Sequence, residues 1–169
     1  MNKSVLIVTP FFAPQTHAAV FRAYKLAKHL PRFGWKPYVL TVDTNYLYNE
    51  DPSLLTALPP EVEIHRARYI EPTLRGARMA LGGKDRTFVT QKHQLALCEP
   101  AQGAAPAMVA ASRRIYHSFL QRYCQAPDQY RTWLRPAVRL GRRLISAHSI
   151  PIVYTTCLPY TCNQIGLKL

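Results

Sequence analysis

Patterns that identify several common classes of enzyme are missing from this chain of 169 residues. Only 7 glycines are present, and the first apolar run, Val5–Val8, is not followed by the GxGxxG pattern of dinucleotide-binding folds. The triplet Gly82-Gly83-Lys84 is not a phosphate-binding P-loop, because Arg78 stands where the loop needs its first glycine and Asp85 where it needs Ser or Thr. GxSxG and HExxH are absent too, which argues against serine-nucleophile and zinc-peptidase chemistry.

Cysteine and long apolar segments are also scarce. The four cysteines, Cys98, Cys124, Cys157 and Cys162, form no CxxC pair, and no Cys/His set has zinc-site spacing. We interpret them as unpaired thiols in a reducing compartment and predict no metal or other cofactor. No apolar run has membrane-spanning length, and the N-terminal run is too short for a signal peptide. We therefore expect a cytoplasmic protein.

Acidic residues are few, because 9 Asp and Glu stand against 22 Lys and Arg, which gives a net charge of +13. Such a surface attracts nucleic acid, anionic lipid headgroups or phosphorylated substrates. We predict that one helical arc binds anions, in particular the inner face of an anionic membrane; it consists of Arg135, Arg139, Arg142 and Arg143. Tyr130 and Trp133, just upstream, are residues suited to an interface. The alternative is an ordinary solvated helix face.

Apolar runs and helical patterns alternate along the chain, which predicts an α/β protein with a Rossmann-like, doubly wound, mostly parallel sheet. The expected strands are residues 5–8, 38–42, 61–67 and 150–156, and right-handed crossovers set their order as 3-2-1-4. The expected helices are residues 17–30, 52–58, 107–124 and 134–148, with a further helix opened by Pro159. Residues 71–106 are expected to form a variable basic excursion.

Apolar periodicity predicts which helix faces are buried. The first helix is expected to bury Val20, Ala23, Tyr24, Ala27 and Leu30, and Gly34 is a natural stop after it. The helix at 134–148 is expected to bury Val138, Gly141, Leu144 and Ile145. We expect Ile165 and Leu167, in the last helix, to have little to pack on.

The predicted order makes the first and fourth strands neighbours, with their helices leaving to opposite faces. Ligands of such folds bind in the crevice at the carboxyl ends of those strands, here lined by residues 10–17 and 155–160. His17 can hydrogen-bond a sugar hydroxyl or phosphate, and Arg22 can reach an anion near the helix N-terminus. Hydrogen bonds to an acceptor can also come from Thr155, Thr156, Tyr160 and Thr161. The alternative is that all are ordinary helix-start, surface and capping residues.

The opening of the chain resembles the start of family 4 glycosyltransferases. The likeness rests on a hydrophobic strand, a loop with Phe11, Phe12 and Pro14, Arg22 in the first helix, and the segments Lys25–Leu30 and Phe33–Pro37. Residues 127–169 are similar to the middle of the same N-terminal domain, with a Pro-Asp link, an Arg-rich helix, a strand and a Leu-Pro-Tyr-Thr turn. The chain carries Thr16-His17-Ala18-Ala19 where the family usually has a Gly-Gly pair.

The resemblance implies the GT-B architecture, two Rossmann-like domains with the active site between them. It implies an enzyme that transfers a sugar from a nucleotide-sugar to an acceptor such as a lipid-linked or cell-envelope glycan. Residues 1–169 would then be a partial, acceptor-side domain, without the donor-binding domain and inactive alone. No catalytic residue is assigned. Two alternatives stay open: a non-catalytic remnant or partner subunit, and a basic Rossmann-like module that binds nucleic acid, which only the charge favours.

Overall fold

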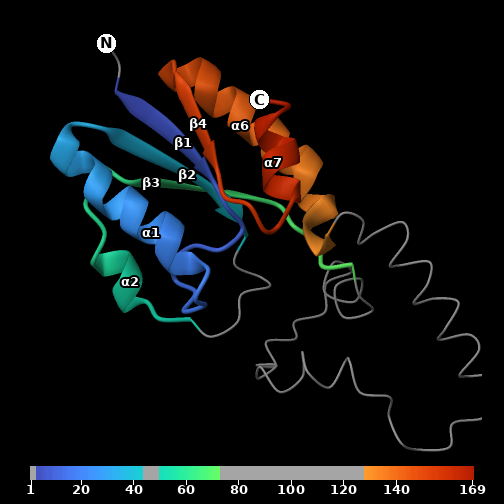
Figure 1. Cartoon of the computed structure of the whole chain (residues 1–169), viewed down its shortest axis with the longest axis horizontal. Helices are drawn as coiled ribbons and strands as arrows, with labels where there is room; N and C mark the ends of the chain where they lie inside the picture. The colour runs from blue at the N-terminus through green and yellow to red at the C-terminus, as the bar shows by residue number, and fades with distance from the viewer. Residues whose placement is uncertain (1–2, 44–49, 73–127) are drawn as a thin grey trace, which may run out of the picture.

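The computed structural model describes residues 3–43, 50–72 and 128–169 (Figure 1). The predicted helix at 107–124 and nearly all of the predicted basic excursion lie outside these residues. The described strands form one parallel sheet in the order β3-β2-β1-β4, which confirms the predicted order and a Rossmann-like α/β fold. The strands are β1 (Ser4–Val8), β2 (Lys36–Val42), β3 (Glu63–Ala67) and β4 (Ile152–Thr155).

Strand β1 lies in the interior of the sheet and pairs with both β2 and β4. Ile7 stands opposite Val39 in β2 and opposite Tyr154 in β4. All five residues of β1 are buried, as its unbroken apolar run predicts for a strand with helices on both faces. Strand β4 lies at one end of the sheet order, and Ile152 in it is 45% exposed.

Helices cover the two faces of the sheet (Figure 1). Helices α1 (Val20–His29) and α2 (Ser53–Thr56) lie on one face, and α6 (Leu134–His148) and α7 (Thr161–Gly166) lie on the other. Two 3₁₀ turns, η1 (Leu30–Phe33) and η4 (Gln129–Trp133), follow α1 and precede α6. The helices after β1 and β4 therefore leave to opposite faces, as predicted.

The ends of α1 follow local chain geometry. It begins at Val20 rather than near His17, because residues 17–20 form a turn in which the Val20 N–H donates to the His17 carbonyl at 2.9 Å. Gly34 lies just after η1 at φ 74°, a left-handed conformation that glycine adopts at little cost. Its N–H donates to the Pro31 carbonyl at 2.9 Å. The predicted stop at Gly34 is confirmed.

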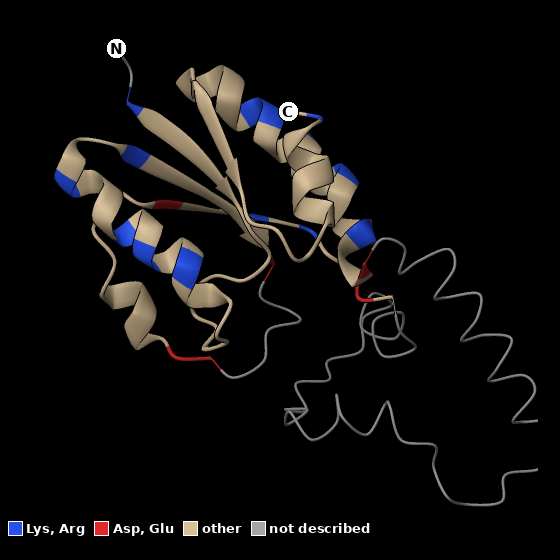
Figure 2. Ribbon diagram, in the orientation of Figure 1, with Lys and Arg blue, Asp and Glu red and all other residues tan. Residues whose placement is uncertain are grey.

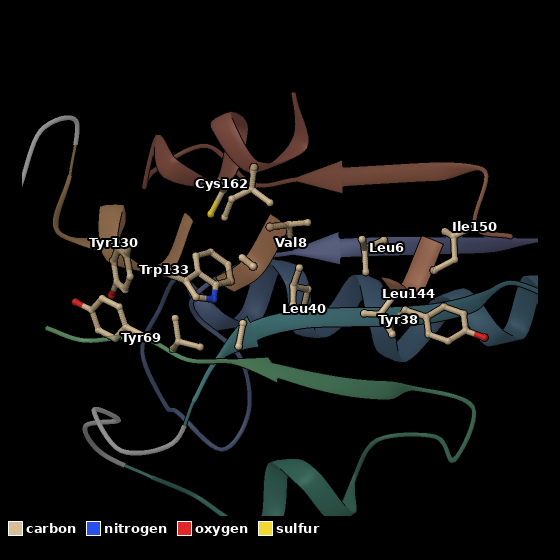
Figure 3. Packing of buried hydrophobic residues seen from close by; sticks show 14 residues of the cluster. Leu6, Val8, Tyr38, Leu40, Tyr69, Tyr130, Trp133, Leu144, Ile150 and Cys162 are labelled. Carbon is tan, nitrogen blue, oxygen red and sulfur yellow. The ribbon is translucent and has the colours of Figure 1, made fainter. Parts of the chain in front are cut away.

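Each face of the sheet has its own hydrophobic core. On the α1 face, Val5, Ile7 and Val39 pack with residues of α1 and with Phe12. On the α6 face, the core contains large aromatic side chains. Figure 3 shows Tyr130, Tyr69 and Trp133 toward one end of this core and Tyr38 toward the other. Trp133 is fully buried and Tyr130 is 9% exposed, so these two residues, expected to suit an interface, belong to the core instead.

Helix α6 has the predicted bounds, but its buried face is rotated from the predicted one. Ala137, Gly141 and Leu144 are buried, whereas Val138 and Ile145 are only half-buried. Trp133 and Ala137 belong to the buried core on this face, and Val138 and Ile145 pack against that core while remaining partly exposed. In α7, Ile165 is fully buried in the same core, contrary to expectation, while Leu167 beyond it is 89% exposed.

Candidate functional site at the carboxyl edge of the sheet

Two loops meet at the carboxyl ends of β1 and β4, where the strand order reverses. We call them the carboxyl-edge loops: residues 9–19 after β1 and residues 156–160 after β4. The first is tied to the neighbouring strand at its start, because the Thr9 N–H donates to the Leu40 carbonyl at 3.1 Å and the Thr41 hydroxyl donates to the Pro10 carbonyl at 3.3 Å. These bonds fix where the loop leaves the sheet.

Arg66 holds the middle of the first loop from the other side of β2. Its guanidinium donates to the carbonyls of Ala13 at 2.7 Å and Val42 at 3.1 Å, which joins β3, β2 and the loop. Burial lowers the pKa of this guanidinium, and the nearby carboxylates of Glu50 and Asp43 oppose that shift. The sequence offers no signal for this role, since Arg66 lies in an alternating strand where a charged side chain usually faces solvent.

His17 lies exposed at the rim of the first loop, and its ring is positioned by two contacts. Its Nδ1 accepts a hydrogen bond from the Ala19 N–H at 3.2 Å. Neutral imidazole has one donor and one acceptor nitrogen, so Nε2 carries the proton and can donate. The ring also stacks on Phe11, with 5.2 Å between the ring centroids. His17 therefore lies in the turn that precedes α1, and its Nε2–H is a placed hydrogen-bond donor.

Aromatic contacts continue from His17 toward the second loop. Phe11 meets Tyr130 edge to face at a centroid distance of 5.6 Å, and Tyr130 packs against Tyr69 at 5.1 Å. Tyr130 belongs to η4, which leads into α6. The rings thus connect the loop after β1 with the segment that precedes α6.

Asp128 connects η4 with the start of α7. Its carboxylate accepts hydrogen bonds from the Tyr130 N–H at 2.9 Å, the Thr161 N–H at 2.7 Å and the Thr161 hydroxyl at 2.7 Å. One side chain therefore caps η4 and holds the start of α7. We call the series His17, Phe11, Tyr130, Asp128 and Thr161 the edge chain. Asp at the start of a turn is an ordinary signal, but the contact with Thr161 spans 33 positions.

The threonines predicted to face a ligand make internal contacts. Thr155 donates from its hydroxyl to the Asn163 amide oxygen at 2.9 Å, and Thr161 is fully buried on Asp128. Thr156 is 7% exposed and lies beside Cys162. Burial raises the pKa of the Cys162 thiol to about 12, and the charges of Asp128 and Cys157 add to that rise.

The other two predicted site residues face solvent. Tyr160 is 53% exposed at the end of the second loop, and Arg22 is exposed in the first turn of α1. The first loop also contains a residue that the sequence did not single out. Gln15 is 7% exposed, and its Oε1 has no hydrogen-bond partner within the described part of the chain. The carboxyl edge therefore presents His17, Tyr160 and Arg22 outward over a framework of internal hydrogen bonds.

A second feature is an open hollow of about 960 Å³ along the outer side of α6. All four arginines of the predicted arc line it, joined by Arg131 of η4, Lys168, Thr132, Leu134 and Val138. We call the five arginines the arginine face: Arg131, Arg135, Arg139, Arg142 and Arg143. Figure 2 shows several blue Lys and Arg segments along α6. The four arginines of the predicted arc therefore lie on one surface. Their binding to a membrane stays a prediction.

No family model, curated protein or solved structure matches this chain. In residues 3–43, 50–72 and 128–169, no helix is both long and apolar enough to cross a membrane. The same residues contain no group of three or more His, Cys, Asp or Glu side chains placed to hold a metal ion. The fold and the contacts described above therefore carry the functional argument.

Proposed function

We propose that this domain is the acceptor-side half of a sugar-transferring enzyme of the GT-B kind. Its activity would be transfer from a nucleotide-sugar to an acceptor such as a lipid-linked or cell-envelope glycan. The observation that carries the proposal is the edge chain, which joins the first loop to the start of α7, directly after the second loop, at the point where the strand order reverses. Crevices at that point are the ligand sites of open α/β sheets. The resemblance to family 4 glycosyltransferases supplies the choice of chemistry.

The side chains that face outward suit a carbohydrate. Pockets for polar ligands combine apolar and aromatic walls with a few placed donors and acceptors. Here His17 has its Nε2–H available as a donor and its ring backed by Phe11, while Tyr160 offers a phenol hydroxyl. Arg22 near the N-terminus of α1 is suited to an anionic group of the acceptor, such as a phosphate. The buried threonines act as the framework of the site and not as ligands.

The test uses NMR to measure the binding of acceptor analogues to the 169-residue chain. The probes are a short-chain prenyl diphosphate disaccharide, the free disaccharide and inorganic diphosphate. We expect both saccharides to shift the ring signals of His17 and to leave those of His29, which is exposed in the last turn of α1, unchanged. His17→Ala should weaken binding by about tenfold, the effect of one lost hydrogen bond, and His29→Ala should not.

Three results would count against the proposal. Equal binding by the His17→Ala and parent proteins would place the acceptor elsewhere. Binding of diphosphate alone, with no response to either saccharide, would show an anion site and not a glycan site. No binding by any probe would favour the reading of the chain as a non-catalytic remnant or partner subunit.

A further inference from the structure

Four residues of the arginine face stand in one regular row. Arg131, Arg135, Arg139 and Arg143 follow one another at intervals of four positions, from η4 along α6. Residues four apart are neighbours on a helix, with roughly 5–6 Å between their Cβ atoms. Like charges at this spacing destabilise a helix slightly. Helix formation alone therefore does not account for the row.

Three arginines of the row, Arg135, Arg139 and Arg143, are not neutralised by carboxylates of the described residues. Within the described ranges, no acidic residue lines the hollow, and Arg135, Arg139 and Arg143 make no ion pair. Arg142 differs from these three, because its Nε and Nη2 both donate to the Lys168 carbonyl, at 3.1 and 2.8 Å. Arg142 thus anchors the segment after α7, and the other three guanidinium groups are left for an external anion.

Apolar surface lies among the guanidinium groups. Leu134 and Val138 are half-buried and line the hollow together with the arginines. No aromatic ring lines it within the described residues, so it lacks the stacking platforms on which single-stranded nucleic acid is bound. Cationic side chains beside exposed apolar ones are typical of helices that lie on an anionic bilayer.

We propose that the arginine face binds an anionic bilayer surface, with Arg135, Arg139 and Arg143 contacting lipid headgroups and Arg142 holding the segment after α7. This proposal does not depend on sugar transfer. Thr132, at one end of the hollow, donates to the Ile70 carbonyl just beyond β3 at 2.6 Å, so the bound surface begins beside the carboxyl edge. Each near-surface arginine adds about fivefold to partitioning, so the three together contribute about a hundredfold.

The test is sedimentation with vesicles of phosphatidylcholine, with and without phosphatidylglycerol. The parent protein is expected to bind only the anionic vesicles and to be released at about 1 M salt, where the Debye length falls to roughly 3 Å. Arg135→Gln, Arg139→Gln and Arg143→Gln, combined in one variant, should reduce partitioning by about a hundredfold. The matched control removes three exposed charges elsewhere, through Lys25→Gln, Arg32→Gln and Arg68→Gln. Circular dichroism melting establishes that both variants are folded.

Three other outcomes of these experiments would overturn the proposal. A control variant that loses as much binding as the arginine variant would overturn the proposal, because net charge alone would then explain attachment. Release by inorganic phosphate beyond that by chloride at the same ionic strength would indicate a discrete phosphate site and overturn it as well. Tighter binding to duplex DNA than to anionic vesicles, lost with the same three arginines, would assign the face to nucleic acid instead.

Discussion

The carboxyl edge and the arginine face are both rich in polar side chains, but they use them differently. At the carboxyl edge, Asp128 accepts hydrogen bonds from Thr161, and the Thr155 hydroxyl donates to the Asn163 side chain. On the arginine face, Arg135, Arg139 and Arg143 have no ion-pair partner within the described residues. Polar residues at a strand end therefore do not by themselves mark a ligand site. The more informative sign is a set of charged groups that folding leaves unpaired.

Substitutions at the carboxyl edge and on the arginine face should have different effects. Changes at the carboxyl edge should alter stability, because they remove internal contacts. Changes at Arg135, Arg139 or Arg143 should leave stability nearly unchanged and alter binding. Arg142 differs from these three, since it donates to a backbone carbonyl.

The largest expected difference is in thiol reactivity at the carboxyl edge. Cys157 is exposed and Cys162 is buried. N-Ethylmaleimide should label Cys157 at least about a thousandfold faster, because Cys162 becomes accessible only when the region unfolds. Mass spectrometry of the digested protein measures both rates. Similar rates would mean that this edge opens readily, which would contradict the view that its groups are held by internal contacts.

The raised pKa of Cys162 predicts how the stability of the protein changes with pH. The folded thiol titrates near 12, whereas the unfolded one titrates at about 8.5. Its contribution is therefore fully present below about pH 8.5 and is lost as the pH rises toward 12. Denaturation of Cys162→Ala and the parent protein across this interval should show a shallower decline for the variant. Parallel curves would contradict the assignment of the burial effect to Cys162.

Asp128→Ala is expected to be the most destabilising single change at the carboxyl edge. It removes the acceptor of three hydrogen bonds. We expect a loss of about 3 kcal/mol in the free energy of unfolding, measured with urea. Asp128→Asn retains one acceptor oxygen and should lose about half as much. If both variants match the parent protein, the edge chain is not a stabilising element.

Gly166→Ala should cost about 2 kcal/mol, since the new Cβ would lie 2.6 Å from the Thr155 Cγ2. Thr155→Ser removes that methyl group while keeping a hydroxyl, so the double variant should recover most of the loss. Gly141→Ala in α6 is the contrasting case. Its Cβ would lie 2.8 Å from the end of the Leu169 side chain and 3.3 Å from the Leu40 Cδ2, and the gain in helix propensity of about 1 kcal/mol offsets these contacts. Thermal melts of all four proteins measure these effects.

The smallest expected effect separates two arginines on one helix. Arg142→Gln loses the bonds to the Lys168 carbonyl and should lower stability by less than about 1 kcal/mol. Arg139→Gln should leave the urea midpoint unchanged and reduce vesicle binding instead. A reversal of the two results would remove the distinction that we draw between anchoring and exposed arginines.

Much of the fold was predictable from local patterns. The run Val5–Val8 could be recognised as a strand covered on both faces, and the periodicity of residues 134–148 predicted α6 with its observed bounds. These patterns are local, because the period of apolar residues reflects which side of an element is buried. The order 3-2-1-4 followed from the right-handed crossover rule, which needs only the sequence of elements.

The candidate site was predictable only as a location. The rule for open α/β sheets indicated the ends of β1 and β4, where His17 and Tyr160 are exposed. The roles of Thr155 and Thr161 were not readable, because an unpaired hydroxyl and one that binds a distant residue look the same in sequence. Trp133 was misjudged for a related reason, since an aromatic residue suits a core as well as an interface.

Sequence therefore determined the elements, their order and the row of arginines, all of which depend on spacing along the chain. Tertiary structure decided which polar groups are already bound. Asp128 reaches Thr161, and Arg66 reaches Ala13, across 33 and 53 positions. Arg142 turns to the Lys168 carbonyl while Arg139, one turn away, does not. These choices depend on distances between segments far apart in sequence, and only the folded packing sets those distances.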